Sequence, residues 1–280
     1  MNAPVQCTHT VAGGGPQTKG SCHDAYVATL TEIAAHLDEL LRAPAFRDFG
    51  PNGLQVPGRE DVATVVTGVS AQRALFERAL EEEADAVLVH HGLFWRGAPL
   101  ALDRPAARRL KLLLAGDVSL LAYHLPLDGH PEHGNNALLA AGLGSQRWGP
   151  FAHHEGEAIG VAAQLPGDGL EPGELAERVT ALCGQQPLAF LDAGPARIRT
   201  LGIVSGAGAD YLPASIAAGH DAFLTGEPIE RAMHTAREAG VHFLAAGHYA
   251  TETFGVRRLG ELLEARFDVR HVWLDIPNPI

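Results

Sequence analysis

The sequence predicts an α/β protein built from two similar three-layer halves, each with a mixed sheet, related by a pseudo-twofold axis. Two observations predict this fold: short apolar strands alternate with amphipathic helices along the chain, and the two parts of the chain align with each other. Strands that alternate with helices form βαβ units, in which helices cover both faces of a largely parallel sheet. With 280 residues, of which 46% are hydrophobic, the chain can bury a core in each half.

A short tail and two halves are the expected organisation. Residues 1–22 are rich in glycine and polar residues toward their end and lack the apolar centre of a signal peptide, so we expect a disordered tail. The first half then spans residues 23–148, and the second half spans residues 149–280.

The first half is expected to begin with a helix near Asp24. Its apolar residues recur at helical spacing, at Tyr26, Leu30, Ile33, Leu37 and Leu40. A stretch with turn chemistry, FGPNGLQVPG, follows this helix. Next come the strand VATVVTGVS, the helix RALFERALEEEA, the strand DAVLVHHG, the helix RRLKLLLAGD and the strand VSLLAYHLPLD. This order predicts consecutive βαβ units.

The second half repeats that plan. Residues 149–199 are expected to add the strands AIGVAAQL and PLAFLDAG and the helix GELAERVTALCG. After them, TLGIVSGAGADYLPASIAAGHDAFLTGE aligns with TVVTGVSAQRALFERALEEEADAVLVHHG, and HFLAAGHYATE aligns with LLAYHLPLD. The alignment matches polar residues at strand ends: Asp85 with Asp221, His91 with Glu227, His124 with His248, and Asp128 with Glu252.

Composition excludes several classes of function. The net charge of -12 repels phosphate backbones, so nucleic acid is not an expected partner. No apolar run reaches the roughly 18 residues that span a bilayer, so no membrane partner is expected either. The three cysteines, Cys7, Cys22 and Cys183, form no CxxC pair, which fits a reducing cytoplasm. The 15 histidines, against 21 lysines and arginines together, direct attention to metal binding.

Three segments, VLVHHGLFW, YHLPLDGH and GHYATE, place histidines and carboxylates at the ends of predicted strands. Ligands of parallel α/β sheets gather at the carboxyl ends of strands. Adjacent His90 and His91 point to opposite sides of an extended strand, so each can serve a different ion. The i,i+4 spacing of His248 and Glu252 puts both on one face of a helical turn.

A pair of metal ions suits these residues, because a carboxylate can bridge two cations about 3.5–4 Å apart. Ligands with nitrogen and oxygen but no sulfur are compatible with Zn, Mn, Fe, Co or Ni and do not select among them. A single histidine after a strand is more often a core or surface residue. Its recurrence at three strand ends favours the metal site.

Several of these motifs together resemble the Nif-three-like family, whose bacterial YbgI-type members are named GTP cyclohydrolase I type 2 homologues. The resemblance runs in order from about Asp24 to the C-terminus through PNGLQV, VTGVSA, HHGLFW, HLPLD with GNNALLA, DAFLTGE, AAGHYATE and DIPNP. It implies two similar α/β halves, a homo-hexameric ring and two divalent metal ions per chain. Carried across motif by motif, the implied metal ligands are His90, His91, Asp128, His248 and Glu252.

The function that these observations favour is a metal-dependent hydrolase acting on a small-molecule substrate, with GTP cyclohydrolase I type 2-like chemistry on a nucleotide as its most specific form. Catalytic candidates are Glu227, as a proton-transferring carboxylate or a cap of the following helix, and His124, as a partner of the ligands or a residue that orients a loop. The alternatives are a non-catalytic protein for metal storage or delivery, a ring-forming structural or regulatory protein, and an adaptor for other proteins.

Two further groups could contact a substrate. Phe94 and Trp95 could stack on a heterocycle, although packing is the commoner role of such side chains. Arg96, Arg104, Arg108 and Arg109 form the nearest basic cluster, which could bind phosphates or merely solvate its helix.

Overall fold

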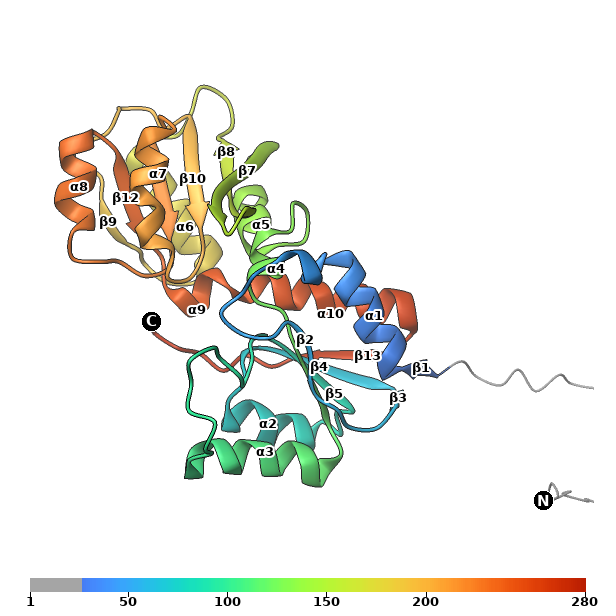
Figure 1. Ribbon diagram of the computed structural model, residues 1–280. Helices are drawn as coiled ribbons and strands as arrows, with labels where there is room; N and C mark the ends of the chain where they lie inside the picture. The colour runs from blue at the N-terminus through green and yellow to red at the C-terminus, as the bar shows by residue number, and fades with distance from the viewer. Residues whose placement is uncertain (1–26) are drawn as a thin grey trace, which may run out of the picture.

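The computed structural model describes residues 27–280 and arranges them in two α/β halves, one above the other in Figure 1. The expected tail, residues 1–22, lies outside the described residues, and so does Tyr26. The first helix, α1 (Leu30–Leu40), begins at Thr29, whose side chain accepts a hydrogen bond from the backbone N–H of Glu32 while the Glu32 carboxylate accepts one from the backbone N–H of Thr29. This reciprocal capping fixes the start of the helix.

The first sheet has five strands and contains the predicted βαβ units. From edge to edge, its order is β13 (Arg270–Trp273), β4 (Thr64–Ser70), β5 (Ala86–His91), β6 (Ser119–Ala122) and β2 (Gly53–Val56). All neighbours are parallel except β2, which is antiparallel to β6, so the sheet is mixed. A separate two-stranded sheet pairs β1 (Ala28–Thr29) with β3 (Asp61–Val62).

Helices cover both faces of this first sheet. On one face, α2 (Arg73–Glu81) and α3 (Arg104–Gly116) pack on residues that include Val66 and Val87. On the other, α1 and α10 (Thr253–Phe267) pack on residues that include Val65 and Leu88. Successive strand residues point to opposite faces, so continuous apolar strands such as TVVTGV fill both layers of the core.

The second sheet has six strands. Its order is β7 (Arg147–His154), β8 (Glu157–Gln164), β10 (Thr200–Val204), β11 (Ala222–Thr225), β12 (His242–Ala245) and β9 (Leu188–Phe190). The three strands β10, β11 and β12 are parallel, while β7, β8 and β9 are antiparallel to their neighbours. Both sheets are therefore mixed and helix-covered, which confirms the predicted α/β class.

The helices of the second half lie on either face of that sheet. One face carries α6 (Pro172–Cys183) and α5 (Asn135–Gly142), and the other carries α7 (Leu212–Ala217), α8 (Ala232–Ala239) and α4 (Leu125–Gly129). Short helical turns complete the chain at η1 (Ala43–Ala45), η2 (Gly208–Tyr211) and α9 (His248–Thr251). No helix within residues 27–280 is both long and apolar enough to cross a bilayer.

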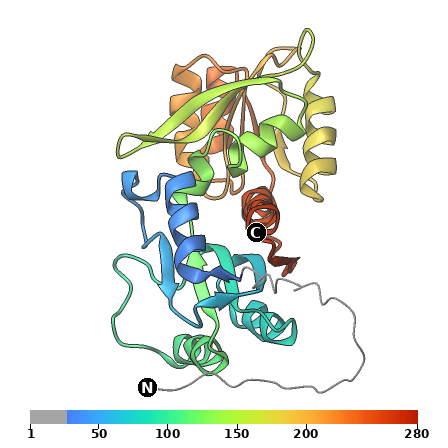
Figure 2. The same ribbon diagram turned by 90° about the vertical axis from the view of Figure 1, so that its right-hand side faces the viewer.

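Each expected half contributes a helix to the core of the other half. Leu139 of α5 belongs to the expected first half but packs in the core of the second sheet. Conversely, α10 and β13 belong to the expected second half, residues 149–280, yet α10 packs on the first sheet and β13 pairs with β4. Figures 1 and 2 show α10 between the two sheets. This exchange ties the halves together where α4, α9 and α10 meet.

The aligned aspartates have the same role in both halves. Oδ2 of Asp85 accepts hydrogen bonds from the backbone N–H groups of Ala63 and Thr64, just where β4 begins. Oδ2 of Asp221 accepts the equivalent bonds from Arg199 and Thr200 at the start of β10. This correspondence, together with the parallel cores β4–β5–β6 and β10–β11–β12, is consistent with the expected pseudo-twofold relation.

Candidate metal centre

The histidines and carboxylates predicted at the ends of strands come together where the two halves join. His90 and His91 are the last two residues of β5, and Asp128 lies in α4, just beyond β6. His248 begins α9 after β12, and Glu252 lies between α9 and α10. The carboxyl ends of parallel strands from both sheets thus direct these side chains into one place.

The carboxylate of Glu252 is the centre of this cluster. Its Oε2 lies 3.1 Å from Nε2 of His248 and 3.2 Å from Nε2 of His91, and its Oε1 lies 3.5 Å from Nε2 of His90. His90 Nε2 is also 3.6 Å from Oδ2 of Asp128. The structure therefore brings together all five side chains expected to bind metal.

Four histidines share one orientation. Each has its Nδ1 atom within hydrogen-bond distance of a protein oxygen: the Tyr123 carbonyl at 2.9 Å for His90, the Ser70 hydroxyl at 3.1 Å for His91, the Asp48 carboxylate at 2.7 Å for His124, and the Glu227 carboxylate at 2.5 Å for His248. When such an oxygen accepts the Nδ1 proton, Nε2 can offer its lone pair to a metal ion once any second proton has left, which is the arrangement typical of histidines that ligate metal.

Buried polar atoms at the centre lack hydrogen-bond partners. His90 is fully buried and Glu252 is 2% exposed, yet Nε2 of His90 and Oε2 of Glu252 have no hydrogen bond within the described residues. Leaving such atoms unsatisfied costs about 1–3 kcal/mol each, and more when they are charged. A cation between the imidazole nitrogens and the carboxylate oxygens would satisfy both, so the donor set fits a metal ion.

The cluster divides into overlapping groups of ligand size. Three sets of side chains place ligand atoms within 4.8 Å of one another: His91 with His248 and Glu252, His90 with Asp128 and Glu252, and His90 with His91 and His124. Glu252 belongs to the first two sets. The Glu252 carboxylate could therefore serve as a ligand in either of two neighbouring groups.

Asp128 is held by a buried polar network. Its Oδ1 accepts hydrogen bonds from Nδ2 of Asn135 at 2.9 Å and from the Ser205 hydroxyl at 3.0 Å, which leaves Oδ2 for the cluster. Asn135 also accepts a bond from the backbone N–H of Gly255 in α10. The amide of Asn135 therefore joins Asp128 to helix α10.

Gly206 leaves room for the cluster. Its φ of +56° lies in the left-handed region, and a Cβ there would stand 2.1 Å from Oε1 of Glu252 and 3.0 Å from Nε2 of His248. A side chain would thus enter the space between the ligands. Only glycine combines this backbone conformation with so close an approach.

Comparison with known proteins places this geometry in a family. The family model Duf34/NIF3 (NGG1p interacting factor 3) matches residues 28–279. The chain belongs to the Duf34/NIF3 family. It is 45% identical over 250 residues to a protein of Pseudomonas aeruginosa named GTP cyclohydrolase 1 type 2 homolog, covering 89% of this chain and 98% of that one. An Escherichia coli K12 protein with the same name is 44% identical over 249 residues, with the same coverage.

Three solved structures of other proteins have the same fold. Protein ybgI, described as of unknown function, superposes with a TM-score of 0.85 at 42% identity, covering 90% of this chain and all of that one. A protein from Thermus thermophilus gives 0.82 at 40% identity with the same coverage. Reduced HcgD from Methanocaldococcus jannaschii gives 0.76 at 21% identity, covering 89% of this chain and 98% of that one, and shows likeness of fold alone.

Protonation in this Duf34/NIF3 protein follows the burial and charges of the cluster. Burial lowers the pKa of His90, but the Asp128 and Glu252 carboxylates outweigh it and raise the pKa to about 9. Burial likewise opposes protonation of His248, while Glu252 and Glu227 raise its pKa to about 9. Burial lowers the pKa of His91 to about 3, reinforced by the neighbouring histidines.

The two carboxylates of the cluster are shifted in opposite directions. Burial raises the pKa of Asp128, although His90 opposes the shift. Burial also disfavours the charged form of Glu252, but the surrounding histidines outweigh it and hold the pKa of Glu252 well below its ordinary value. The low pKa of Glu252 therefore favours its ionised form among the imidazoles.

The structure places both catalytic candidates, Glu227 and His124, beside the expected metal ligands. Glu227 does not cap the following helix, since α8 begins at Ala232 with Arg231 as its N-cap. Its carboxylate instead binds Nδ1 of His248. His124 stands beside the ligands, with a ring nitrogen in the group that contains His90 and His91. Both side chains thus touch the cluster.

Sequence reasoning missed Asp48. This residue is 4% exposed, and its carboxylate accepts hydrogen bonds from Nδ1 of His124 and from the backbone N–H of Leu125. It therefore fixes the start of α4 and the orientation of His124. Asp48 lies in the turn-rich stretch before β2, where nothing in the sequence distinguishes it from a turn residue.

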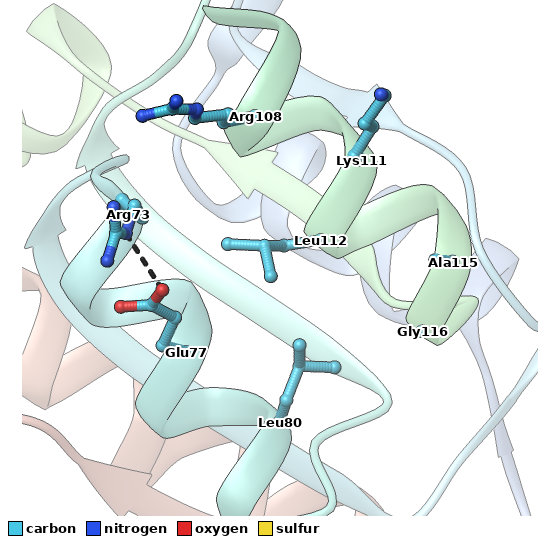
Figure 3. Close-up of a pocket in the computed structure, with 8 residues that line it drawn as sticks. All are labelled: Arg73, Glu77, Leu80, Arg108, Lys111, Leu112, Ala115 and Gly116. Carbon is cyan, nitrogen blue, oxygen red and sulfur yellow. Dashed lines mark hydrogen bonds and ion pairs between the residues drawn. The ribbon is translucent and has the colours of Figure 1, made fainter. Parts of the chain in front are cut away.

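Two arginines of the expected basic cluster, Arg96 and Arg108, line hollows that contain none of the metal ligands. Arg108 lines a hollow of about 470 Å³ between α2 and α3, beside Lys111 and across from the ion pair of Arg73 and Glu77 (Figure 3). Arg96 lines a different hollow, near Asp48. The hollow of Figure 3 shares no residue with the cluster, so its positive charge does not serve that site.

Proposed function

We propose that this Duf34/NIF3 protein holds two divalent metal ions on His90, His91, Asp128, His248 and Glu252, and uses them to hydrolyse a small-molecule substrate. The observation that carries the proposal is the shared orientation of the histidines. The Nδ1 atoms of His90, His91 and His248 each contact a protein oxygen, and their Nε2 atoms lie 3.5, 3.2 and 3.1 Å from the Glu252 carboxylate. Such preorganisation by surrounding acceptors is the usual support of a metal site.

When bound, a pair of divalent ions supplies Lewis acidity toward an electrophilic centre and makes water acidic enough to ionise near neutral pH. The chain itself provides the framework for this chemistry. Glu252 supplies the buried negative charge, and the Asn135 and Ser205 donors keep one oxygen of Asp128 out of the site. The exposed parts of His91, His124 and His248 leave the cluster accessible from one side.

We propose that Glu227 transfers protons during the reaction. Its side chain is 38% exposed, so it can exchange protons with water, and its Oε1 contacts Nδ1 of His248. A carboxylate in that position can take a proton from a reacting group and return it to solvent. His124, held by Asp48, is the second group that touches the open side.

Hydrolysis of a purine nucleotide is the most specific form of the proposal. The names of the Pseudomonas and Escherichia relatives support it, since both are called homologues of GTP cyclohydrolase 1 type 2. Water would attack C8 of the imidazole ring, and the ring would open. We also propose that the protein assembles into a homo-hexamer and is located in the cytoplasm.

The experiment is a turnover assay on protein loaded in turn with Zn, Mn, Fe, Co and Ni. Substrates are GTP, followed by loss of its purine absorbance, and a set of phosphoesters and cyclic amides. We expect turnover that disappears in the Glu252→Ala variant, with Glu238→Ala on the exposed face of α8 as the control. Turnover that survives Glu252→Ala would rule out the dinuclear mechanism. Metal without turnover would favour the storage or structural function.

A further inference from the structure

Two exposed aromatic rings lie beside His124 at the edge of the metal centre. Phe49 precedes β2 and is 51% exposed, and Trp95 follows β5 and is 36% exposed. Both lie beside the same imidazole: the ring centroid of Trp95 is 5.2 Å from that of His124, and the centroid of Phe49 is 6.1 Å from it. Exposed aromatic side chains gathered at one opening are typical of ligand sites.

Trp95 also lies beside the accessible metal ligand of β5. Its ring centroid is 6.0 Å from that of His91, whose side chain is 18% exposed, whereas the side chain of His90 is fully buried. Three histidines of the cluster are partly exposed, His91, His124 and His248, and Trp95 lies beside the first two.

Main-chain contacts hold the two rings in place. The backbone N–H of Arg96 donates to the carbonyl of Phe49 at 2.6 Å, which clamps the two loops together. A Cβ on Gly50 would stand 2.4 Å from the carbonyl oxygen of Phe94, so the loops touch directly. The indole N–H of Trp95 donates to the carbonyl of Gly92, which satisfies its polar atom within its own loop.

The same carboxylate that orients His124 also orients Phe49. Oδ1 of Asp48 accepts hydrogen bonds from Nδ1 of His124 and, at 2.6 Å, from the backbone N–H of Phe49. One buried group thus holds the imidazole of His124 and the backbone at Phe49 relative to each other. A backbone held rigidly at a site limits the conformational freedom that is lost when a flat ligand stacks on its side chain.

We propose that Phe49 and Trp95 are specificity-determining residues that select substrates carrying a flat conjugated ring and stack on that ring while the reacting atom lies near His91 and His124. The inference rests on the proposed function for the reaction itself, but ring selection is a property of binding and can be measured separately. Phe94, 39% exposed in the same loop, has no ring contact with these histidines among the described residues and is not assigned this role.

The test uses guanosine monophosphate and ribose 5-phosphate, which share the sugar phosphate and differ in the ring. Their dissociation constants are measured by calorimetry on the full chain, as purified and after metal loading. We expect the native protein to prefer guanosine monophosphate by about tenfold or more, the range of one base stacked on an aromatic side chain. That preference should fall to near unity in Trp95→Leu and shrink in Phe49→Leu, while Phe94→Leu keeps it.

Quenching of tryptophan fluorescence by guanosine monophosphate, lost in Trp95→Leu, provides a second readout that does not depend on turnover. Equal binding of the two ligands by the native protein, or an unchanged preference in both variants, would overturn the proposal. So would a change in particle mass with an unchanged preference, which would assign the rings to contacts between copies. Metal content measured on the same samples separates these results from failure of the metal centre.

Discussion

Nε2 of His248 lies 3.1 Å from Oε2 of Glu252, four residues further along the chain, where the short helix α9 gives way to α10. Their other contacts come from different halves, because Glu227 of the second half binds His248 while His90 and His91 of the first half lie within 3.5 Å of the Glu252 carboxylate. The helical turn from His248 to Glu252 therefore connects side chains that follow strands of both sheets.

Space around the Glu252 carboxylate is the first testable feature. Gly206→Ala should abolish metal binding, because the added Cβ would meet Oε1 of Glu252. The matched control is Gly219→Ala, which also has a positive φ but has no neighbouring atom within 4 Å of the added Cβ. Both variants should lose about 1 kcal/mol of unfolding free energy from backbone strain. Only Gly206→Ala should lose bound metal, measured by mass spectrometry; equal metal in the two variants would contradict the assigned geometry.

Asp48 provides a test of indirect support. Asp48→Asn removes the charge that faces Nδ1 of His124 while keeping the size of the side chain. We expect metal affinity or turnover to fall by about 10- to 100-fold, the usual effect of losing a group that orients a metal-site histidine. Asp268→Asn, at an exposed position after α10, should leave both unchanged. Wild-type affinity and turnover in Asp48→Asn would show that His124 needs no orienting charge.

Glu227 is expected to affect turnover more than metal content. In Glu227→Gln an amide still reaches Nδ1 of His248, but the group can no longer take a proton. With the best substrate from the metal-loaded screen, kcat should fall by about 100-fold, within the usual contribution of a general base. The number of bound ions should stay as in the native protein. The exposed Glu230→Gln is the control, and equal kcat in the two variants would remove Glu227 from the mechanism.

Metal binding should release protons. His90 and His248 have pKa values raised to about 9, so both are protonated near pH 7 in the metal-free protein, and a metal ion must displace those protons. We expect about two protons released per chain near pH 7, fewer as pH rises through 9, and affinity that rises over the same interval. Calorimetry in two buffers with different ionisation enthalpies measures this number; heats that do not depend on the buffer would contradict it.

The same shifts set the pH dependence of the metal-free fold. A histidine whose pKa is higher in the folded state than its ordinary value of 6.5 stabilises the fold fully below 6.5. That contribution is lost as pH rises through about 9. The metal-free protein should therefore become less stable to urea between pH 6.5 and 9, and the metal-loaded protein should not show this loss.

Much of the fold was predictable because strand and helix periodicity are local. The strands that end at His91 and Ala245, and the helical turn that brings His248 toward Glu252, follow from apolar runs and i,i+4 spacing. The exchange of α5 and α10 between the sheets was not predictable, since an amphipathic helix records that one face is buried and not which sheet buries it. The expected boundary at residues 148 and 149 follows chain order, whereas α10 and β13 return to the first sheet.

Parts of the site depend on contacts across long sequence separations. Asp48 reaches His124, 76 residues away, and Ser205 reaches Asp128, 77 residues away. Such pairs leave no periodic signal in one sequence. The alignment with His91 identifies Glu227 as a candidate. Its contact with His248, 21 residues further along the chain, depends on the fold and is not indicated by the alignment.

Counting metal ions per chain shows whether the cluster holds two cations. Native protein purified without added metal is compared by mass spectrometry with the His90→Ala/Glu252→Ala double variant, and circular dichroism checks that both are folded. We expect close to two ions per native chain and none in the folded variant. A native chain without metal, even after reconstitution with Zn, Mn, Fe, Co or Ni, would rule out the dinuclear site.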